Sequence, residues 1–168
     1  MLKKLRVLIF LGAALFFVSC GYYSFTGASI PPEVETISIQ HFPNQASMVQ
    51  PTLSQTLTDA LKDRFMSQTN LNIINAHGDL QIEGAIVNYQ TAPVAIQSDD
   101  RAALNRLTIT IRVKFTNLYD EKQNFETTLS RYEDYDSSLS LSAVEDRLIK
   151  NITEALVEDI FNRTVVNW

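Results

Sequence analysis

Residues 105–117 alternate between apolar and polar side chains over almost their whole length. The apolar positions are Leu107, Ile109, Ile111, Val113 and Phe115. The polar positions around them are Arg106, Thr108, Thr110, Arg112, Lys114 and Thr116. Because successive side chains of a strand point to opposite faces, this pattern predicts a strand with one buried and one solvated face. An antiparallel sheet covered on one side only provides that environment, so the rest of the chain must supply the cover.

The remaining sequence supplies further strands and two helices. Alternation predicts strands over residues 34–42, 79–89 and 124–135. Apolar residues at helical spacing predict helices over residues 51–67 and 140–163. The order is therefore β-α-β-β-β-α. The predicted fold class is an α+β two-layer sandwich, with about four mostly antiparallel strands and both helices on one face.

Several local signals refine these elements. Two pairs of residues have the spacing of a capping box at a helix start: Thr52 with Gln55, and Ser142 with Glu145. Asp120-Glu121-Lys122 is the expected connection of the last hairpin. Gly84 indicates a bulge, and Pro93 argues against a long central strand around it.

The N-terminus has a different character from this domain. A basic cluster, Lys3, Lys4 and Arg6, precedes the uncharged run of residues 7–18. Basic, apolar and then small residues form the pattern of a secretory signal peptide. A membrane-spanning helix needs about 20 apolar residues, so this run is too short to span. A short transmembrane or buried helix is the alternative interpretation.

The only Cys of the chain, Cys20, follows this run. Phe17-Val18-Ser19-Cys20-Gly21 resembles a bacterial lipobox, except that Phe17 stands where Leu is usual. The resemblance implies that residues 1–19 are a lipoprotein signal peptide and that Cys20 carries lipid such as palmitate, which holds the chain on a membrane surface. An ordinary signal peptide with an incidental Cys is the alternative. A single Cys also excludes an intramolecular disulfide framework.

Cleavage before Cys20 defines the expected organisation of the mature chain. Residues 20–32 would be a lipidated tether, and residues 33–168 a single α/β binding domain. Loss of Lys3, Lys4 and Arg6 would change the formal net charge from −5 to −8. This acidic balance disfavours nucleic acid as a partner.

The sequence offers little for catalysis. His41 and His77 lie at a strand end and in a turn, where a histidine is usually solvated. Carboxylates gather at Glu133, Asp134 and Asp136, but their spacing matches no EF-hand loop. We find no nucleophile elbow and no phosphate-binding glycine loop in the sequence. The expectation is a protein that is not an enzyme and that uses no cofactor or metal.

Basic residues give the one candidate binding site. Arg106, Arg112 and Lys114 share one face of the strand predicted over residues 105–117. Guanidinium and ammonium groups on one face could bind an anion, such as a lipid phosphate or a sugar carboxylate. The alternative is that these cations pair across strands with Glu126 or Glu133.

The chain resembles the lipopolysaccharide-assembly lipoprotein family, LptE. The most specific likeness is Cys20-Gly21-Tyr22-Tyr23-Ser24-Phe25-Thr26-Gly27 at the predicted mature start. The strand Thr36-Ile37-Ser38-Ile39 and the helix opening Pro51-Thr52-Leu53-Ser54-Gln55 are similar to the Bacteroidetes branch. The β-α-β-β-β-α order of the family would cover the whole mature chain.

This resemblance implies a function in the Gram-negative outer membrane. Such a lipoprotein faces the periplasm, binds and helps assemble the LptD-type β-barrel translocon that inserts lipopolysaccharide, contacts lipopolysaccharide, and has no catalytic activity. Gly21 after the Cys agrees with outer-membrane placement, because it is not the Asp that retains lipoproteins at the inner membrane. The alternative is a free periplasmic lipid- or glycan-binding lipoprotein. The sequence assigns no role to Tyr22, Tyr23, Phe25 or Trp168 and no face to the barrel.

Overall fold

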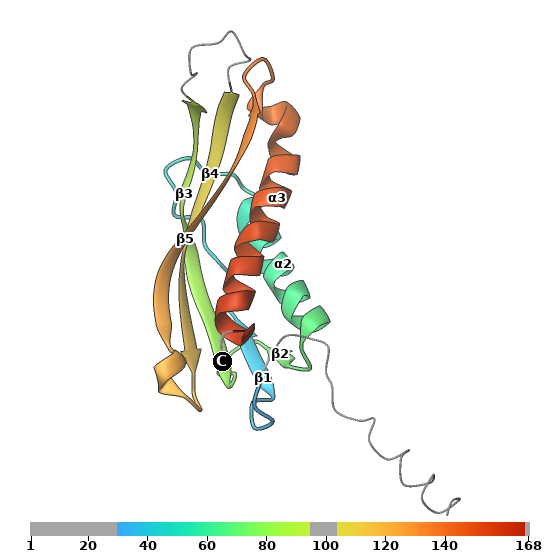
Figure 1. The fold of residues 1–168 in the computed structure, drawn as a ribbon, viewed down its shortest axis with the longest axis vertical. Coiled ribbons are helices and arrows are strands. Elements are labelled where there is room, and N and C mark those ends of the chain that lie inside the picture. The colour runs from blue at the N-terminus through green and yellow to red at the C-terminus, as the bar shows by residue number, and fades with distance from the viewer. Residues whose placement is uncertain (1–29, 95–103, 167–168) are drawn as a thin grey trace, which may run out of the picture.

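The computed structural model describes residues 30–94 and 104–166, which form one sheet and two long helices (Figure 1). The elements along the chain are β1 (Thr36–Ile39), α2 (Leu53–Gln68), β2 (Asn72–Ile74), β3 (Leu80–Val94), β4 (Leu104–Asn117), the 3-10 turn η2 (Glu121–Gln123), β5 (Phe125–Asp136), α3 (Leu141–Phe161) and the π-helical turn η3 (Asn162–Val166). Both helices cover the same face of the sheet, which confirms the predicted α+β sandwich.

The sheet has five strands in the order β2-β1-β3-β4-β5. β4 pairs antiparallel with β3 on one side and with β5 on the other, as a meander of long strands. β1 pairs parallel with both β2 and β3. The sheet is therefore mixed, with its long antiparallel part at one side and its short parallel part at the other.

The core lies between the sheet and the two helices. Leu53, Leu57, Leu61 and Phe65 of α2 are fully buried, as their four-residue spacing predicts. They meet the buried face of the sheet together with Leu148, Ile152 and Leu156 of α3. All five apolar residues predicted to face inward on β4 are at most 1% exposed. The alternation over residues 105–117 thus correctly identified the buried face of the central strand.

The fifth strand, β2, is absent from the sequence-based prediction. It is only three residues long, Asn72–Ile74, and follows directly after α2. Three residues are too few to display a period, so the pattern gave no signal. Its register is set instead by β1, because Ile73 lies opposite Ile37 in the parallel ladder.

β3 differs from the prediction in two ways. It continues through Pro93 to Val94, because β1 flanks only residues 80–82 and, apart from the bridge of Ile86 to residues 43–45, the rest of β3 pairs with β4 alone. A proline is tolerated on such an open strand edge. The register shift lies between Ile86 and Asn88, not at Gly84. Gly84 is needed for another reason: a Cβ there would collide with the Phe42 ring and the Arg112 carbonyl oxygen.

Neither predicted capping box forms. The side chain of Thr52 makes no cap hydrogen bond; Gln50 Oε1 accepts instead from the backbone N–H of Thr52 at 2.6 Å and of Leu53 at 3.1 Å. At α3 the N-cap is Ser140, again without a side-chain cap. The Tyr89 hydroxyl donates to Glu145 at 2.5 Å, so that carboxylate is used for a contact between β3 and α3.

A carboxylate joins β1 to β3 where they begin. Asp79 Oδ2 accepts hydrogen bonds from the backbone N–H of Glu35 (3.0 Å) and Thr36 (2.9 Å) and from the Thr36 hydroxyl (2.8 Å). These bonds favour the charged form of Asp79 and therefore lower its pKa below the ordinary value. The hydrogen bond from the Thr36 hydroxyl has the largest effect. The preceding Gly78 allows the close approach, since a Cβ there would lie 2.6 Å from Ser38 N.

Some expectations fall outside the described residues. Cys20, the aromatic residues Tyr22, Tyr23 and Phe25, and Trp168 all lie there, so the lipid anchor, the tether and the chain end stay predictions. Across residues 30–94 and 104–166, none of the helices combines the length and apolarity that membrane crossing requires.

Candidate functional site

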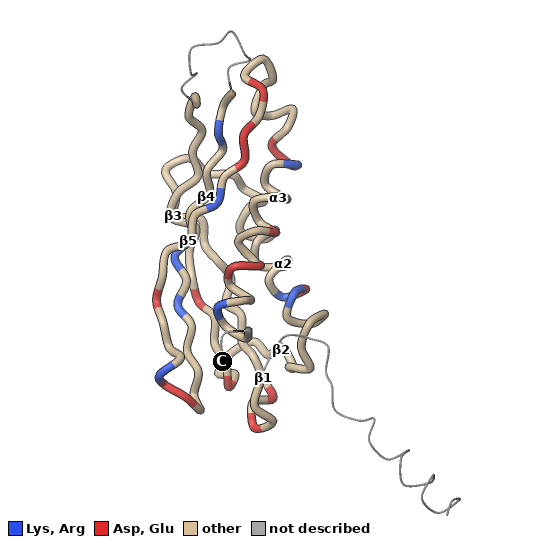
Figure 2. Tube along the Cα trace, in the orientation of Figure 1, with Lys and Arg blue, Asp and Glu red and all other residues tan. Residues whose placement is uncertain are grey.

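The candidate site is the face of the sheet that the helices do not cover. On β4 this outer face carries Arg106, Arg112 and Lys114, as predicted from the alternation. The adjoining positions on β5 include Glu126, Tyr132 and Asp134. Figure 2 shows basic and acidic residues following one another along β4 and β5. The outer face therefore combines both signs of charge on neighbouring strands.

Arg106 is tightly held at the upper end of this face. Its Nε and Nη2 donate to the two carboxylate oxygens of Asp134, at 2.7 and 2.9 Å. Its guanidinium lies 3.6 Å from the centroid of the Tyr132 ring. The hydrogen bond from Arg106 lowers the pKa of Asp134. A bidentate, stacked guanidinium is fixed in position, so Arg106 is already committed to a carboxylate.

Arg112 and Lys114 are held much more loosely. Arg112 Nε lies 3.9 Å from Glu126 Oε1, and Lys114 Nζ lies 3.5 Å from Glu83 Oε2. All four side chains are at least half exposed. Exposed pairs of this kind contribute about 0–1 kcal/mol, so an incoming anion could take either cation at small cost. The cross-strand partner Glu126 was one of the two named from the sequence.

The other named partner, Glu133, points to the opposite face. Its carboxylate accepts from Arg147 Nη1 at 2.6 Å and from Asn151 Nδ2 at 3.1 Å, both on α3. Because strand side chains alternate, Glu133 and Asp134 lie on opposite faces of β5. The acidic cluster in the sequence is thus divided in space. Among the described residues no group of three or more His, Cys, Asp or Glu could hold a metal ion.

The two histidines are placed where the sequence predicted. His41 is exposed after β1, and His77 is exposed in the turn before β3. His77 adopts a left-handed backbone conformation, with φ of 58°. Such a φ is uncommon outside glycine and fits a turn residue.

Sequence reasoning missed the polar contacts that attach α3 to its neighbours. Arg131, on the helix-facing side of β5, donates from Nε and Nη2 to Asp159 at 2.6 and 2.5 Å. The hydrogen bond to Asp159 raises the pKa of Arg131. The charge alternation on β5 could have shown that some charged residues face the helix, but not which helical residue each would meet.

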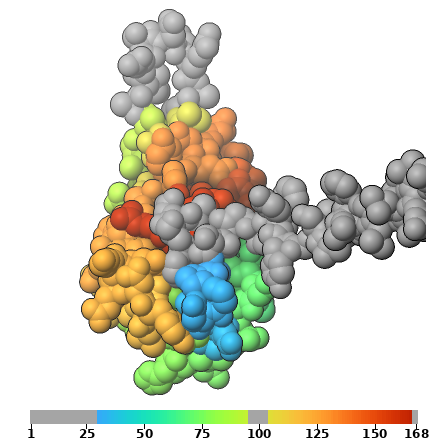
Figure 3. Space-filling view, turned by 60° about the horizontal axis from the view of Figure 1, so that its bottom comes forward, coloured from blue at the N-terminus to red at the C-terminus, as the bar shows by residue number. Residues whose placement is uncertain are grey.

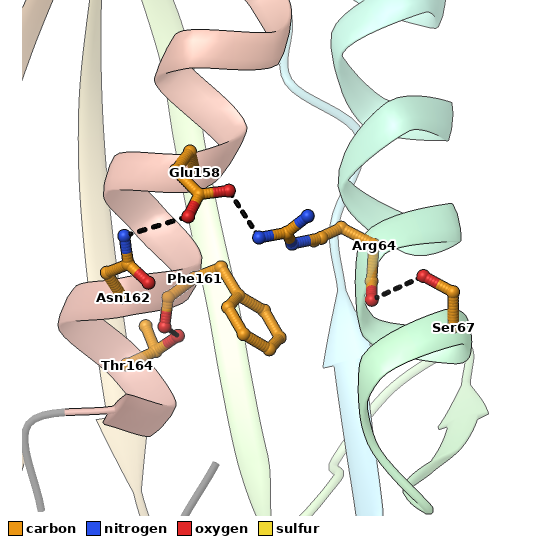
Figure 4. Close-up of polar contacts among 6 residues, drawn as sticks. All are labelled: Arg64, Ser67, Glu158, Phe161, Asn162 and Thr164. Carbon is orange, nitrogen blue, oxygen red and sulfur yellow. Dashed lines mark hydrogen bonds and ion pairs between the residues drawn. The ribbon is translucent and has the colours of Figure 1, made fainter. Parts of the chain in front are cut away.

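A second contact joins α3 to α2 near their lower ends (Figure 4). Arg64 of α2 pairs with Glu158 of α3, and its guanidinium lies 4.9 Å from the centroid of the Phe161 ring. Phe161 also meets Phe65 edge to face, with ring centroids 5.2 Å apart. Asn162 Nδ2 donates to Glu158 at 3.1 Å. These contacts hold the two helices side by side.

Solved structures share this fold. The minor lipoprotein of Acinetobacter baumannii is similar with a TM-score of 0.53 and 13% identity, covering 78% of this chain and 92% of its own. Lipoprotein B of Nitrosomonas europaea has a TM-score of 0.50 and 15% identity, covering 85% and 88%. The hypothetical protein CT253 of Chlamydia trachomatis has a TM-score of 0.53 and 8% identity, covering 80% and 99%. At such low identities the likeness shows the fold alone.

Fold and site together define a small α+β domain of the type found in bacterial lipoproteins. The chain belongs to the LptE lipopolysaccharide-assembly family, which it matches over residues 34–164. This family consists of non-enzymatic outer-membrane lipoproteins, so the predicted absence of catalysis is confirmed by membership. No curated protein matches the chain. The likeness to the Bacteroidetes branch stays a prediction.

Proposed function

We propose that this chain is an outer-membrane lipoprotein, anchored through Cys20 and facing the periplasm, that binds an LptD-type β-barrel and assists its assembly. The observation that carries the proposal is the family match over residues 34–164, which spans every strand of the sheet and α3. Family membership supports association with LptD and lipopolysaccharide in general. The signal-like N-terminus and Cys20 supply the expected anchor.

The outer face of the sheet is the surface that we propose for the anionic part of lipopolysaccharide. Arg112 and Lys114 would bind phosphate or sugar carboxylate, because their present carboxylate partners are distant and exposed. Arg106 would stay in place beside the bound anion, since Asp134 and Tyr132 hold its guanidinium. The nearby carboxylates and the acidic net charge of the chain would repel an anion elsewhere, so we expect the contact to be confined to these cations.

Co-purification tests the partner. A tagged full-length chain, extracted from outer membranes in mild detergent, is expected to recover a β-barrel protein much larger than itself. The Cys20→Ala variant, produced at equal amount, is expected to recover less because it lacks the predicted lipid attachment point. Recovery of no barrel would reject the translocon role. Bound lipid or glycan in mass spectra of that barrel-free protein would favour the alternative of a free carrier.

Charge reversal tests the anion site separately. Arg112→Glu combined with Lys114→Glu is expected to weaken binding of purified lipopolysaccharide to the full-length chain. Lys150→Glu is a matched control, because Lys150 is an exposed cation on α3 at 4.0 Å from Glu154. Equal binding by the double variant, the control and the unaltered chain would reject the outer face as the contact. Both variants should retain the far-ultraviolet circular dichroism of the parent.

A further inference from the structure

β5 forms one edge of the sheet and has a paired neighbour, β4, on one side only. In an antiparallel pair, alternate residues point their N–H and C=O groups away from the partner strand. Among the described residues, no turn, loop or cap hydrogen bond between backbone groups involves residues 125–135. Within residues 30–94 and 104–166, the outward N–H and C=O groups of this 12-residue strand therefore have no backbone partner, and another extended chain could pair with them.

The lower half of this edge lacks the usual protection against pairing. Proteins guard open edges with charged side chains, prolines or bulges. Residues 127–130 are Thr, Thr, Leu and Ser, and their ladder with β4 is continuous. A second strand could thus add along residues 127–130 without meeting a charged side chain of β5, and Arg131, which follows them, is already paired with Asp159.

A groove of about 360 Å³ runs beside the same stretch. One wall is residues 128–131 of β5, and the other is formed by Asp159 of α3 and by Asn162 and Arg163 of η3. Figure 3 shows the end of α3 in red close to the orange segment that contains β5. An open strand edge with a helix beside it is the geometry of domains that bind peptides by adding a strand to their sheet.

The charged side chains that line the groove differ in whether they already have a partner. Asp159 is occupied by two hydrogen bonds from Arg131, at 2.6 and 2.5 Å. Arg163 is exposed, and its guanidinium lies 5.0 Å from the centroid of the Phe125 ring. None of the ion pairs within the described part of the chain includes Arg163, in contrast to Arg131. The groove therefore offers one cation that a carboxylate of an occupant could bind.

We propose that this groove binds an extended segment of a partner protein, added as a sixth strand along residues 128–131, with an acidic side chain placed on Arg163. The edge requires an occupant that both donates and accepts hydrogen bonds at regular spacing, which a polypeptide backbone does and a lipid phosphate does not. Arg112 and Lys114 do not line the groove, although Thr128 at its end lies opposite Arg112 in the ladder of β4 and β5.

Peptide selection on the full-length chain in detergent tests this inference. A phage-displayed library of random short peptides is expected to yield β-branched sequences with one acidic residue. A synthetic peptide from that set should slow backbone amide exchange at residues 128–131, measured by hydrogen–deuterium exchange. Replacing its acidic residue by Lys should weaken binding about tenfold, as loss of one charge-assisted hydrogen bond predicts. The Arg163→Glu chain should prefer the Lys peptide, whereas Lys150→Glu should behave as the parent.

Defined results would overturn the inference. These are enrichment of no peptide, protection at residues other than 128–131, or equal binding of the acidic and Lys peptides to the unaltered chain. The last comparison needs no variant, so it holds even if Arg163→Glu fails to fold. Protection at residues 128–131 that rises with chain concentration alone would instead identify a second copy as the occupant, and would likewise reject the proposal.

Discussion

The centre and the margins of the sheet are stabilised by different means. On β4, Ile109, Ile111 and Val113 face the helices and have no exposed surface. On β5, the residues that face the same way include Arg131 and Glu133, which bind α3 through hydrogen-bonded ion pairs. At the opposite side of the sheet, Asp79 holds β1 by three hydrogen bonds. Apolar burial thus dominates β4, whereas ion pairs attach β5 to α3 and Asp79 adds polar contacts at the start of β1, whose Ile37 and Ile39 are also buried.

This difference indicates how stability and binding are divided in the domain. Complete burial of an aliphatic side chain contributes about 1.5–3 kcal/mol, whereas an exposed ion pair contributes about 0–1 kcal/mol. The exposed ion pairs of β5 and of the outer face can therefore be exchanged at small cost, and the proposed binding surfaces lie at these places. Four experiments test the comparison, in order of decreasing expected effect.

The largest effect is expected from a pair of neighbouring positions, Ile111 and Leu129, which lie directly opposite each other in the ladder. Ile111→Ala should lower the free energy of unfolding by about 3 kcal/mol, because it leaves a cavity in a site without solvent access. Leu129→Ala should cost about 1 kcal/mol, since Leu129 is half-buried at the edge. Urea denaturation measures both values. Equal losses would contradict the contrast between centre and margin.

Added volume should also be costly at the centre. Gly84→Ala places a methyl group against the Phe42 ring and the Arg112 carbonyl oxygen, so we expect a loss of about 2 kcal/mol from overpacking. Thr91→Ala on the same strand is the control; Thr91 is exposed, and its variant should change stability by less than about 0.5 kcal/mol. Thermal unfolding of both variants checks the difference. If Gly84→Ala unfolds at the same temperature as the parent, Phe42 must be able to move aside.

A smaller effect, confined to acid, is expected at Asp79. Its pKa in the folded protein lies below the ordinary value of 3.8, so its charged form stabilises the fold above that value and the contribution is lost as the pH falls through the folded pKa. Asp79→Asn should be less stable than the parent at neutral pH and should lose less stability on acidification. Asp134 and Asp136 also have lowered pKa values, so the stability of the variant should still fall somewhat in acid. Parallel pH profiles of parent and variant would contradict the role of Asp79.

The smallest effect is expected from the ion pair between β5 and α3. A double-mutant cycle with Arg131→Gln and Asp159→Asn should give a coupling energy of about 0.5 kcal/mol, because half of the Arg131 side chain is exposed. Molar salt should reduce this coupling further. A coupling as large as the loss in Ile111→Ala would show that the margin is as tightly held as the centre.

The parts of the fold that the sequence predicted are those in which burial leaves a period. The alternation of β4 and the four-residue spacing in α2 both record which side chains face the core. The parallel pairing of β1 leaves no such record, because the same alternating residues fit either direction. β2 was missed since Asn72–Ile74 is too short for a period, and its place depends on β1.

The candidate site was predictable to a similar degree. The alternation placed Arg106, Arg112 and Lys114 on one face, but their partners depend on the register of β3 and β5. That register decides that Arg106 meets Asp134 with two hydrogen bonds, whereas Lys114 meets Glu83 loosely. The groove beside β5 was not predictable, because it requires the end of α3 to lie next to a strand about thirty residues earlier.

The strand order also has a consequence for timing. β1 lies between β2 and β3, which are both later in the chain, and Thr36 binds Asp79, 43 residues downstream. Long loops close late, whereas β3, β4 and β5 join neighbours and can associate early. β1 therefore has no strand to pair with until residues 72–74 of β2 have been added, and its ladder with β3 requires the chain up to residue 82. The strand that follows the predicted tether is thus held in the sheet only by segments that come after α2.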